Sequence, residues 1–135
     1  MFLDVENVNA TSAIAISDDS TSDFLQIYLD YTSSNPIRYR VSSGGTSQFD
    51  RNFAYSLDVS QPFKIAFRYS ANNFSIWING VKADEVLSGS TPVGLSTIEF
   101  YNIFGAGNKF DGKLNQSLYF PTALSDADCI TLTTI

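Results

Sequence analysis

The 135-residue chain contains no histidine, and this absence removes several kinds of catalytic site. Ser-His-Asp and Cys-His catalysis and His-ligated zinc all depend on an imidazole, so the sequence excludes them. The single cysteine, Cys129, cannot form an intramolecular disulfide and is expected to be a small buried hydrophobic residue rather than a reactive thiol. Carboxylates, hydroxyls, amides and arginines remain as the groups that can carry chemistry.

Long apolar runs and an excess of positive charge are also missing. No apolar run approaches the roughly 20 residues that span a bilayer, so we expect no membrane insertion. The 14 acidic residues outnumber the 8 basic ones and give a net charge of -6, which opposes contact with phosphate backbones and anionic membranes. We therefore expect no nucleic-acid partner.

Aromatic residues, in contrast, are plentiful. They make up 14% of the chain, with 11 phenylalanines and 7 tyrosines, and such residues pack well on the pleated surface of strands. The length suits one domain with one sizeable core, so residues 1–135 are interpreted as a single β-rich domain.

Alternation of apolar and polar side chains predicts the strands. In residues 63–69 the apolar Ile65 and Phe67 fall on one face and Lys64 and Arg68 on the other, as in a half-buried strand. The same pattern predicts strands at residues 14–16, 24–31, 37–41, 74–78, 81–86, 96–103 and 113–120. The pair Asn79-Gly80 predicts a tight hairpin turn, because both residues tolerate positive φ.

Only residues 123–132 show a helical pattern. Ser125 is the expected N-cap, and Asp126 and Asp128 lie in the first turn, where acidic groups suit the helix dipole. Many strands, regular turn signals and one short C-terminal helical turn predict an all-β fold, an antiparallel two-sheet jelly-roll sandwich.

Three sequence elements, in this order, resemble the concanavalin A-like, laminin-G-like jelly rolls of bacteriophage tail and fibre proteins. They are the strand and Trp-x-Asn-Gly turn ending at residues 77–80, the Gly-Lys-Leu strand at 112–114, and YFPTALSDAD at 119–128. Thr122 stands where an arginine is common in that family, and the N-terminal third matches poorly, which suggests a first strand that lacks part of its length. The resemblance implies a fold used largely for binding carbohydrate or for building structure, and less often for catalysis.

Glycoside hydrolysis needs two carboxylates held at a fixed separation across the scissile bond. Related glucanases carry them on one strand as E-x-D-x-E, and this spacing is absent here. The adjacent Asp84 and Glu85 would point to opposite faces of a strand, and Glu99 stands alone on its strand. We therefore predict a protein that is not an enzyme, with a glycan-cleaving enzyme as the weakest alternative.

Calcium is the one metal that the sequence leaves open, and no cofactor is required. Asp18, Asp19 and Asp23 lie within six residues, and hard cations want several oxygen ligands. The D-x-D-x-D-G spacing is absent, however, and acidic loops are usually solvated. A calcium site and a solvated loop both remain as interpretations, with the solvated loop favoured.

The single tryptophan, Trp77, is the leading candidate for ligand binding. If Phe74 and Ile76 face the core, Trp77 lies on the opposite face, where its ring could stack on a sugar while neighbouring groups bond to hydroxyls. Polar residues of other strands could share this face. The predicted glycan site comprises Trp77, Ser75, Asn79, Tyr28, Arg38, Arg40 and Arg68. The alternative is that a loop or a neighbouring subunit covers Trp77.

Together with the resemblance, these residues predict a non-enzymatic carbohydrate-binding or adhesion module of a virion, located on its tail or surface or otherwise outside cells. Its expected partner is a cell-surface glycan. The competing hypothesis is a purely structural module whose polar strand face packs against other virion subunits, including copies of itself in a homo-oligomer.

Overall fold

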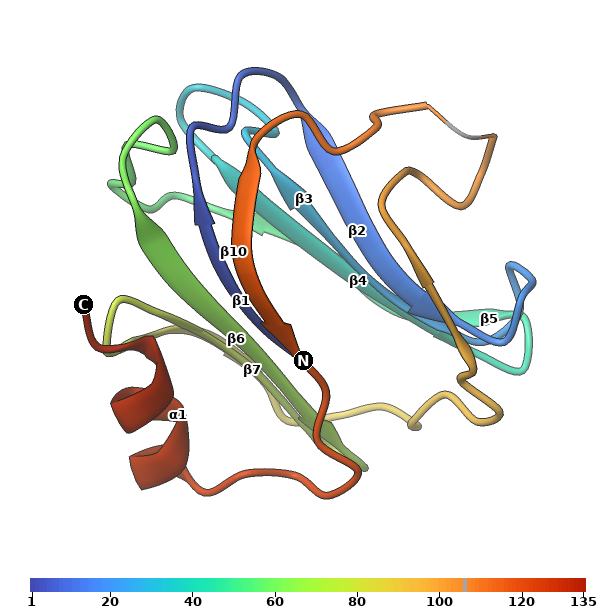
Figure 1. Cartoon of the computed structure of the whole chain (residues 1–135). Helices are drawn as coiled ribbons and strands as arrows, with labels where there is room; N and C mark the ends of the chain where they lie inside the picture. Colours follow the sequence, from blue (N-terminus) through green and yellow to red (C-terminus); the bar gives the residue numbers. More distant parts are fainter. Residues whose placement is uncertain (106) are drawn as a thin grey trace.

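The computed structural model describes residues 1–105 and 107–135, which form two antiparallel sheets packed face to face and one short helix (Figure 1). Sheet A has five strands in the spatial order β10 (Lys113–Leu118), β1 (Phe2–Glu6), β6 (Phe63–Ser70), β7 (Asn73–Ile78) and β8 (Val81–Val86). Sheet B has five strands in the order β5 (Thr46–Phe53), β4 (Ile37–Ser43), β3 (Phe24–Leu29), β2 (Ser12–Ser17) and β9 (Thr97–Glu99). The predicted two-sheet jelly-roll sandwich is confirmed.

The core lies between the sheets because every second residue of the central strands is apolar and points inward. Tyr39 of β4 lies inside this core, and its ring makes edge-on contacts with Phe49, Phe53 and Phe67 at centroid distances of 5.2, 6.0 and 5.3 Å. Its hydroxyl donates to Asp84 Oδ2 at 2.8 Å, which satisfies the polar end of the ring. The aromatic-rich composition is thus used to fill the space between the two sheets.

The turn between β7 and β8 forms where Asn79-Gly80 predicts it. Asn79 has a φ of 48° and Gly80 a φ of 81°, the left-handed values that a tight hairpin turn requires. The turn also contacts the C-terminal helix, because the N–H of Gly80 donates to Thr133 Oγ1 at 3.1 Å.

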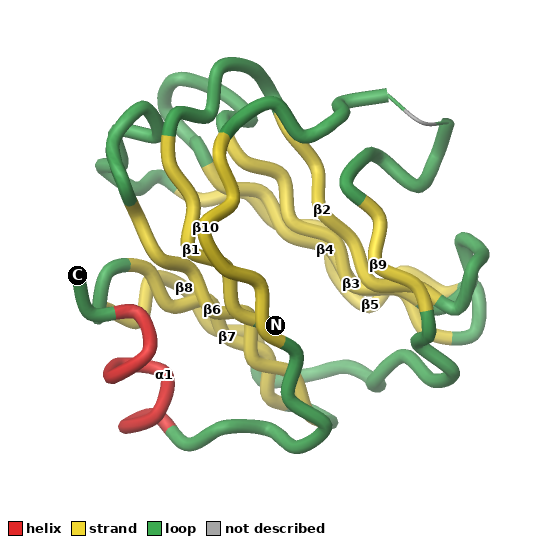
Figure 2. The backbone as a smooth tube through the Cα atoms, viewed as in Figure 1, coloured by secondary structure: helices red, strands yellow, loops and turns green. Residues whose placement is uncertain are grey.

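Helix α1 (Asp126–Thr133) covers part of the outer face of sheet A, where it contacts β1, β6, β7 and β8 (Figure 2). Its predicted N-cap is confirmed: Ser125 and Asp128 form a reciprocal capping box. Asp126 in the first turn forms ion pairs with Arg68 and Lys82 of sheet A. No helix in the described ranges has the length and apolar character needed to cross a bilayer.

The sequence pattern missed two strands and made three others too long. It did not predict β1, which lies between β10 and β6, or β5, whose side chains are mostly solvent-exposed and therefore carry little apolar periodicity. The predicted strand at 96–103 is only three residues long, as β9, because the chain leaves the sheet after Glu99. The strands predicted at 24–31 and 113–120 are confirmed as β3 and β10, and each ends two residues earlier than predicted, at Leu29 and Leu118.

Candidate functional site on the outer face of sheet B

One row of side chains crosses the outer face of sheet B from edge to edge. The strand register pairs Glu99 with Ala15, Ala15 with Gln26, Gln26 with Arg40, and Arg40 with Asp50. Residues directly opposite each other in antiparallel strands point to the same face, so these five side chains all project away from the core. We call them the central row.

The central row holds buried polar atoms that the protein does not satisfy. In the described ranges four buried side-chain polar atoms lack a hydrogen-bond partner, and three of them belong to this row: Glu99 Oε2, Gln26 Oε1 and Arg40 Nε. Gln26 is 0% exposed and Glu99 is 7% exposed. Arg40 Nε has only an ion-pair contact of 3.5 Å to Asp50 Oδ2. Each unpaired buried group costs about 1–3 kcal/mol, so their collection in one row points to a site that a ligand or water completes.

Aromatic rings flank the centre of the row. The guanidinium carbon of Arg40 lies 5.4 Å from the centroid of the Phe24 ring and 4.5 Å from that of Phe104. The segment after β9 brings Phe104 here, because Asn102 Oδ1 accepts from the N–H of Phe104 at 3.1 Å and from Gln26 Nε2 at 3.5 Å. The row therefore combines hydrogen-bonding groups with apolar ring surface.

A neighbouring row contains Tyr28 and Arg38, which are cross-strand partners. The Arg38 guanidinium lies 5.2 Å from the Tyr28 ring and 4.9 Å from the Tyr31 ring, and it donates to both carboxylate oxygens of Asp50 at 2.7 and 2.6 Å. The hydrogen bonds to Asp50 raise the pKa of Arg38 above its ordinary value. Arg38 is thus fixed in position, with its charge balanced by Asp50.

The expectation that Trp77 shares a face with Tyr28, Arg38 and Arg40 is wrong. Trp77 belongs to sheet A and these three residues belong to sheet B, so the two groups lie on opposite sides of the sandwich. Trp77 is only 3% exposed and packs with Phe2, Ala66 and Cys129 beneath α1.

Helix α1, rather than a loop or a neighbouring subunit, covers the Trp77 ring. The indole N–H donates to Ser75 Oγ at 3.1 Å, and Ser75 is fully buried as well. Neither residue presents a surface to a sugar in this structure.

The other two predicted residues of sheet A have structural contacts. Asn79 Oδ1 accepts from the N–H of Lys64 at 2.9 Å and thereby fixes the hairpin. Arg68 donates to the carbonyl of Leu124 and forms an ion pair with Asp126, so it holds α1 and the preceding segment against the sheet.

Two of the three candidate calcium ligands, Asp18 and Asp23, are engaged in organising their loop, whereas Asp19 is exposed. Asp18 Oδ1 accepts from the N–H and the hydroxyl of Ser20, which lowers the pKa of Asp18. Asp23 is buried, and its two oxygens accept from the N–H groups of Val93 and Gly44 at 2.8 and 3.1 Å. Over residues 1–105 and 107–135, no three His, Cys, Asp or Glu side chains are grouped as metal ligands. Calcium binding by Asp18, Asp19 and Asp23 stays a prediction.

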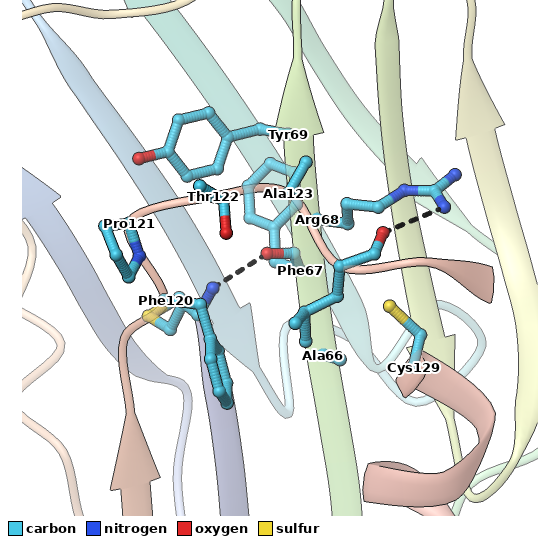
Figure 3. A pocket seen from close by; sticks show the side chains of 11 residues that line it. Ala66, Phe67, Arg68, Tyr69, Phe120, Pro121, Thr122, Ala123 and Cys129 are labelled. Carbon is cyan, nitrogen blue, oxygen red and sulfur yellow. Dashed lines mark hydrogen bonds between the residues drawn. The ribbon is translucent and has the colours of Figure 1, made fainter. Parts of the chain in front are cut away.

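A small pocket lies on the opposite side of the molecule, between β6 and the segment that precedes α1 (Figure 3). Its volume is about 70 Å³, and its lining includes Ala66, Phe67, Phe120 and also Arg68, whose Nε is the fourth buried polar atom without a partner in the described ranges. This volume is that of roughly two water molecules. We interpret it as a packing gap next to α1.

Sequence reasoning missed Phe104, Asn102 and Asp50 as members of the site. Phe104 and Asn102 lie in an irregular segment with no periodic pattern, and only the tertiary fold brings them over Gln26 and Arg40. Asp50 lies on β5, the strand that the sequence did not predict. The sequence did carry one signal for the site. The polar residues that alternate with apolar ones in 24–31 and 37–41 include Gln26, Tyr28, Arg38 and Arg40.

Comparison with solved structures finds the same architecture in CBM40 of the Ruminococcus gnavus IT-sialidase. The form bound to alpha2,3 sialyllactose superposes with a TM-score of 0.72 at 10% identity, covering 98% of this chain and 80% of that chain. The unbound form gives a TM-score of 0.71 at 9% identity with coverages of 98% and 80%, and the form bound to alpha2,6 sialyllactose gives 0.66 at 11% with 98% and 79%. At these identities the similarity shows a shared fold.

A search of curated proteins finds no match. The family model described as the Concanavalin A-like lectin/glucanases superfamily, Laminin_G_3, matches residues 1–129. This match covers nearly the whole two-sheet sandwich, and the chain belongs to the concanavalin A-like lectin/glucanase superfamily.

Proposed function

We propose that this domain binds carbohydrate without cleaving it, and that the glycan lies on the outer face of sheet B. The central row carries the proposal, because Gln26, Arg40 and Glu99 offer two acceptors and one donor that the protein leaves unpaired. Sugar hydroxyls both donate and accept hydrogen bonds and match all three groups chemically. Because the three atoms are buried in this structure, the side chains that cover them must move aside before a sugar can reach them. The rings of Phe24 and Phe104 supply apolar surface next to these groups, as sugar sites require.

The relatives with the same fold support a glycan as ligand, since two of the R. gnavus CBM40 structures contain sialyllactose. The proposed site keeps three of the residues expected from the sequence, namely Tyr28, Arg38 and Arg40. It replaces Trp77, Ser75, Asn79 and Arg68 with Gln26, Glu99, Phe24 and Phe104.

The arrangement of carboxylates along the row supports a non-catalytic role. Glu99 and Asp50 lie on β9 and β5, four strand spacings apart, which corresponds to about 19 Å. Glycosidases need their two carboxylates about 5–10 Å apart. Asp50 is also occupied by Arg38. A digestion assay on polysaccharides that bind should therefore release no sugar. The same assay tests Glu99 with Asp19, the two carboxylates that line one hollow beside β9.

The resemblance to phage tail and fibre proteins leads to the finer part of the proposal. The domain would belong to a virion surface and hold the particle on a cell-surface glycan. The overall charge of -6 is compatible with neutral glycans and unfavourable for nucleic acid.

A purely structural role is the second candidate, and an exposed apolar group around β9 favours it. Ile98, Phe100, Tyr101 and Phe104 are each 39–49% exposed within seven residues of sequence. Such a group could pack against another virion subunit or a second copy of this chain.

Glycan-array binding of the purified domain tests the proposal, with calcium present and again after chelation. We expect binding to a defined class of sugar, and loss of that binding in Arg40→Met but not in the control Lys113→Met, which changes a basic residue of sheet A. Dependence on calcium would assign Asp18, Asp19 and Asp23 a ligand role. No binding, together with a stable oligomer in solution, would favour the structural module.

A further inference from the structure

We infer that the Glu99 end of the central row is a second subsite, and that it accepts an uncharged, hydroxyl-bearing sugar unit and disfavours an acidic one. This inference rests on the proposed glycan-binding function, because the subsite would hold an extension of the sugar that lies over Gln26 and Arg40. It assigns the chemical class of the ligand, which the fold leaves open.

A hollow at this end provides the space. Its volume is about 130 Å³, and it is lined by Asp19, Ser20, Thr21, Glu99, Tyr101 and Ile103. With about 30 Å³ per water molecule, it would hold roughly four waters or one edge of a sugar ring. The hollow lies at the end of the central row, because Glu99, which lines it, and Gln26 are both cross-strand partners of Ala15.

Glu99 supplies an unused acceptor in the hollow. Ser17 Oγ donates to Glu99 Oε1 at 2.6 Å, which fixes the carboxylate, while Oε2 has no partner in the described part of the chain. Glu99 is only 7% exposed, so solvent alone satisfies this oxygen poorly. Once a rotation of the carboxylate or of a lining side chain exposes Oε2 to the hollow, a sugar hydroxyl that donates to it would complete the carboxylate with a charge-assisted hydrogen bond.

The charges around the hollow select against an anionic sugar. Its lining contains two acidic residues, Asp19 and Glu99, and no basic one. The ion pairs found within residues 1–105 and 107–135 include neither of these carboxylates. Arg40 lies three strand spacings from Glu99, about 14 Å, well beyond the Debye length of about 8 Å at physiological ionic strength.

Tyr101 gives the subsite an apolar wall. Its side chain is 39% exposed and lines the hollow, so its ring is accessible for contact with the C–H face of a sugar. Ser20 and Thr21, which also line the hollow, add hydroxyl groups. An aromatic wall, hydroxyls and a carboxylate acceptor together suit a neutral sugar.

The experiment uses an array of matched glycan pairs, such as lactose and alpha2,3 sialyllactose, which differ only by the acidic sugar. The best-bound glycan is then titrated against the wild type, Glu99→Gln, Tyr101→Ala and the control Glu6→Gln on sheet A, each first checked for an unchanged melting temperature. Glu99→Gln keeps an acceptor for Ser17, and Tyr101→Ala changes an exposed side chain, so at least one should fold normally.

We expect the neutral member of each pair to bind better, with little dependence on salt. Loss of a charged acceptor should weaken that binding about tenfold in Glu99→Gln. Tyr101→Ala should weaken it as well, and Glu6→Gln should not.

Preferential binding of sialylated glycans, with affinity that falls as salt rises, would overturn the inference and leave the proposed function standing. Neutral binding that neither variant affects would also overturn the subsite. Failure to bind any glycan would instead remove the proposed function itself.

Discussion

Gln26 and Arg40 are cross-strand partners at the centre of sheet B, and each keeps one buried polar atom without a hydrogen-bond partner in the ranges that the structure describes. A domain of this size has a total stability of about 5–15 kcal/mol, so unpaired groups at about 1–3 kcal/mol each are a substantial loss. Their persistence in one row is what we expect of a binding site that trades stability for function.

Replacing Gln26 with Met should therefore stabilise the protein and weaken glycan binding. The substitution removes the unpaired Oε1 while keeping a side chain of similar length. It also loses the long hydrogen bond of 3.5 Å from Nε2 to Asn102 Oδ1, which still accepts from the N–H of Phe104, so we expect a net gain of about 1 kcal/mol in the free energy of unfolding. Urea unfolding measures the gain and glycan titration the loss. A variant that is less stable and binds normally would show that Gln26 has a structural role.

Replacing Trp77 with Ala should have the opposite profile. The ring is buried under α1, so its removal should cost about 3–5 kcal/mol of unfolding free energy and leave glycan affinity unchanged well below the melting temperature. Because Trp77 is the only tryptophan, its fluorescence in the wild type should be blue-shifted and poorly quenched by acrylamide. Strong quenching that a glycan relieves would place the ring at the ligand instead.

Replacing Asp23 with Ala should destabilise the loops at one end of the sandwich. It leaves the N–H groups of Gly44 and Val93 without their acceptors, and we expect a cost of about 1–3 kcal/mol. If the loop is held by these hydrogen bonds alone, chelation should not change the melting temperature of the wild type. A fall on chelation that calcium reverses would support a bound cation.

Replacing Asp126 with Asn should lower the melting temperature at neutral pH, because the carboxylate holds α1 through Arg68 and Lys82. The hydrogen bond from Arg68, followed by that from Lys82, lowers the pKa of Asp126 below its ordinary value of 3.8. A carboxylate whose pKa is lower in the folded state than in the unfolded state stabilises the folded protein at any pH above its unfolded-state pKa. This stabilisation is lost as the pH falls through the folded-state pKa. The difference between the variant and the wild type should therefore shrink below a pH of about 4.

The control for this measurement is Asp19→Asn. Asp19 is exposed, and its backbone has a positive φ that Asn also tolerates, so the substitution adds no backbone strain. No ion pair found among the described residues includes Asp19, so this substitution should leave the melting temperature nearly unchanged at neutral pH. A difference in melting temperature for Asp126→Asn that persists unchanged at low pH would mean that the ion pairs do not hold the helix.

The sequence predicted the fold correctly wherever an element is encoded by neighbouring residues. Alternation predicted β6 and β7, Asn79-Gly80 predicted the turn after them, and Ser125 with its acidic neighbours predicted α1. It was insufficient where strands have little apolar content, as in β5, and where the chain leaves a sheet, as after β9.

The site was harder to predict because strand alternation tells which face of a strand a side chain occupies, but not which sheet the strand joins. Trp77 and Arg40 each alternate with core-facing apolar residues and so point outward from their strands, yet they lie on opposite sides of the molecule because the strands belong to different sheets. Nor does the pattern reveal that a distant helix covers one outer face and leaves the central row of the other as the candidate site.

Nuclear magnetic resonance titration with the glycan that binds best on the array tests the central claim most directly. The Nε–H signal of Arg40 and the side-chain amide of Gln26 report on sheet B, and the indole N–H of Trp77 reports on the opposite side. The account predicts that the Arg40 and Gln26 signals shift in proportion to occupancy while the Trp77 signal stays in place. A shift of the Trp77 signal with Arg40 and Gln26 unmoved would contradict it.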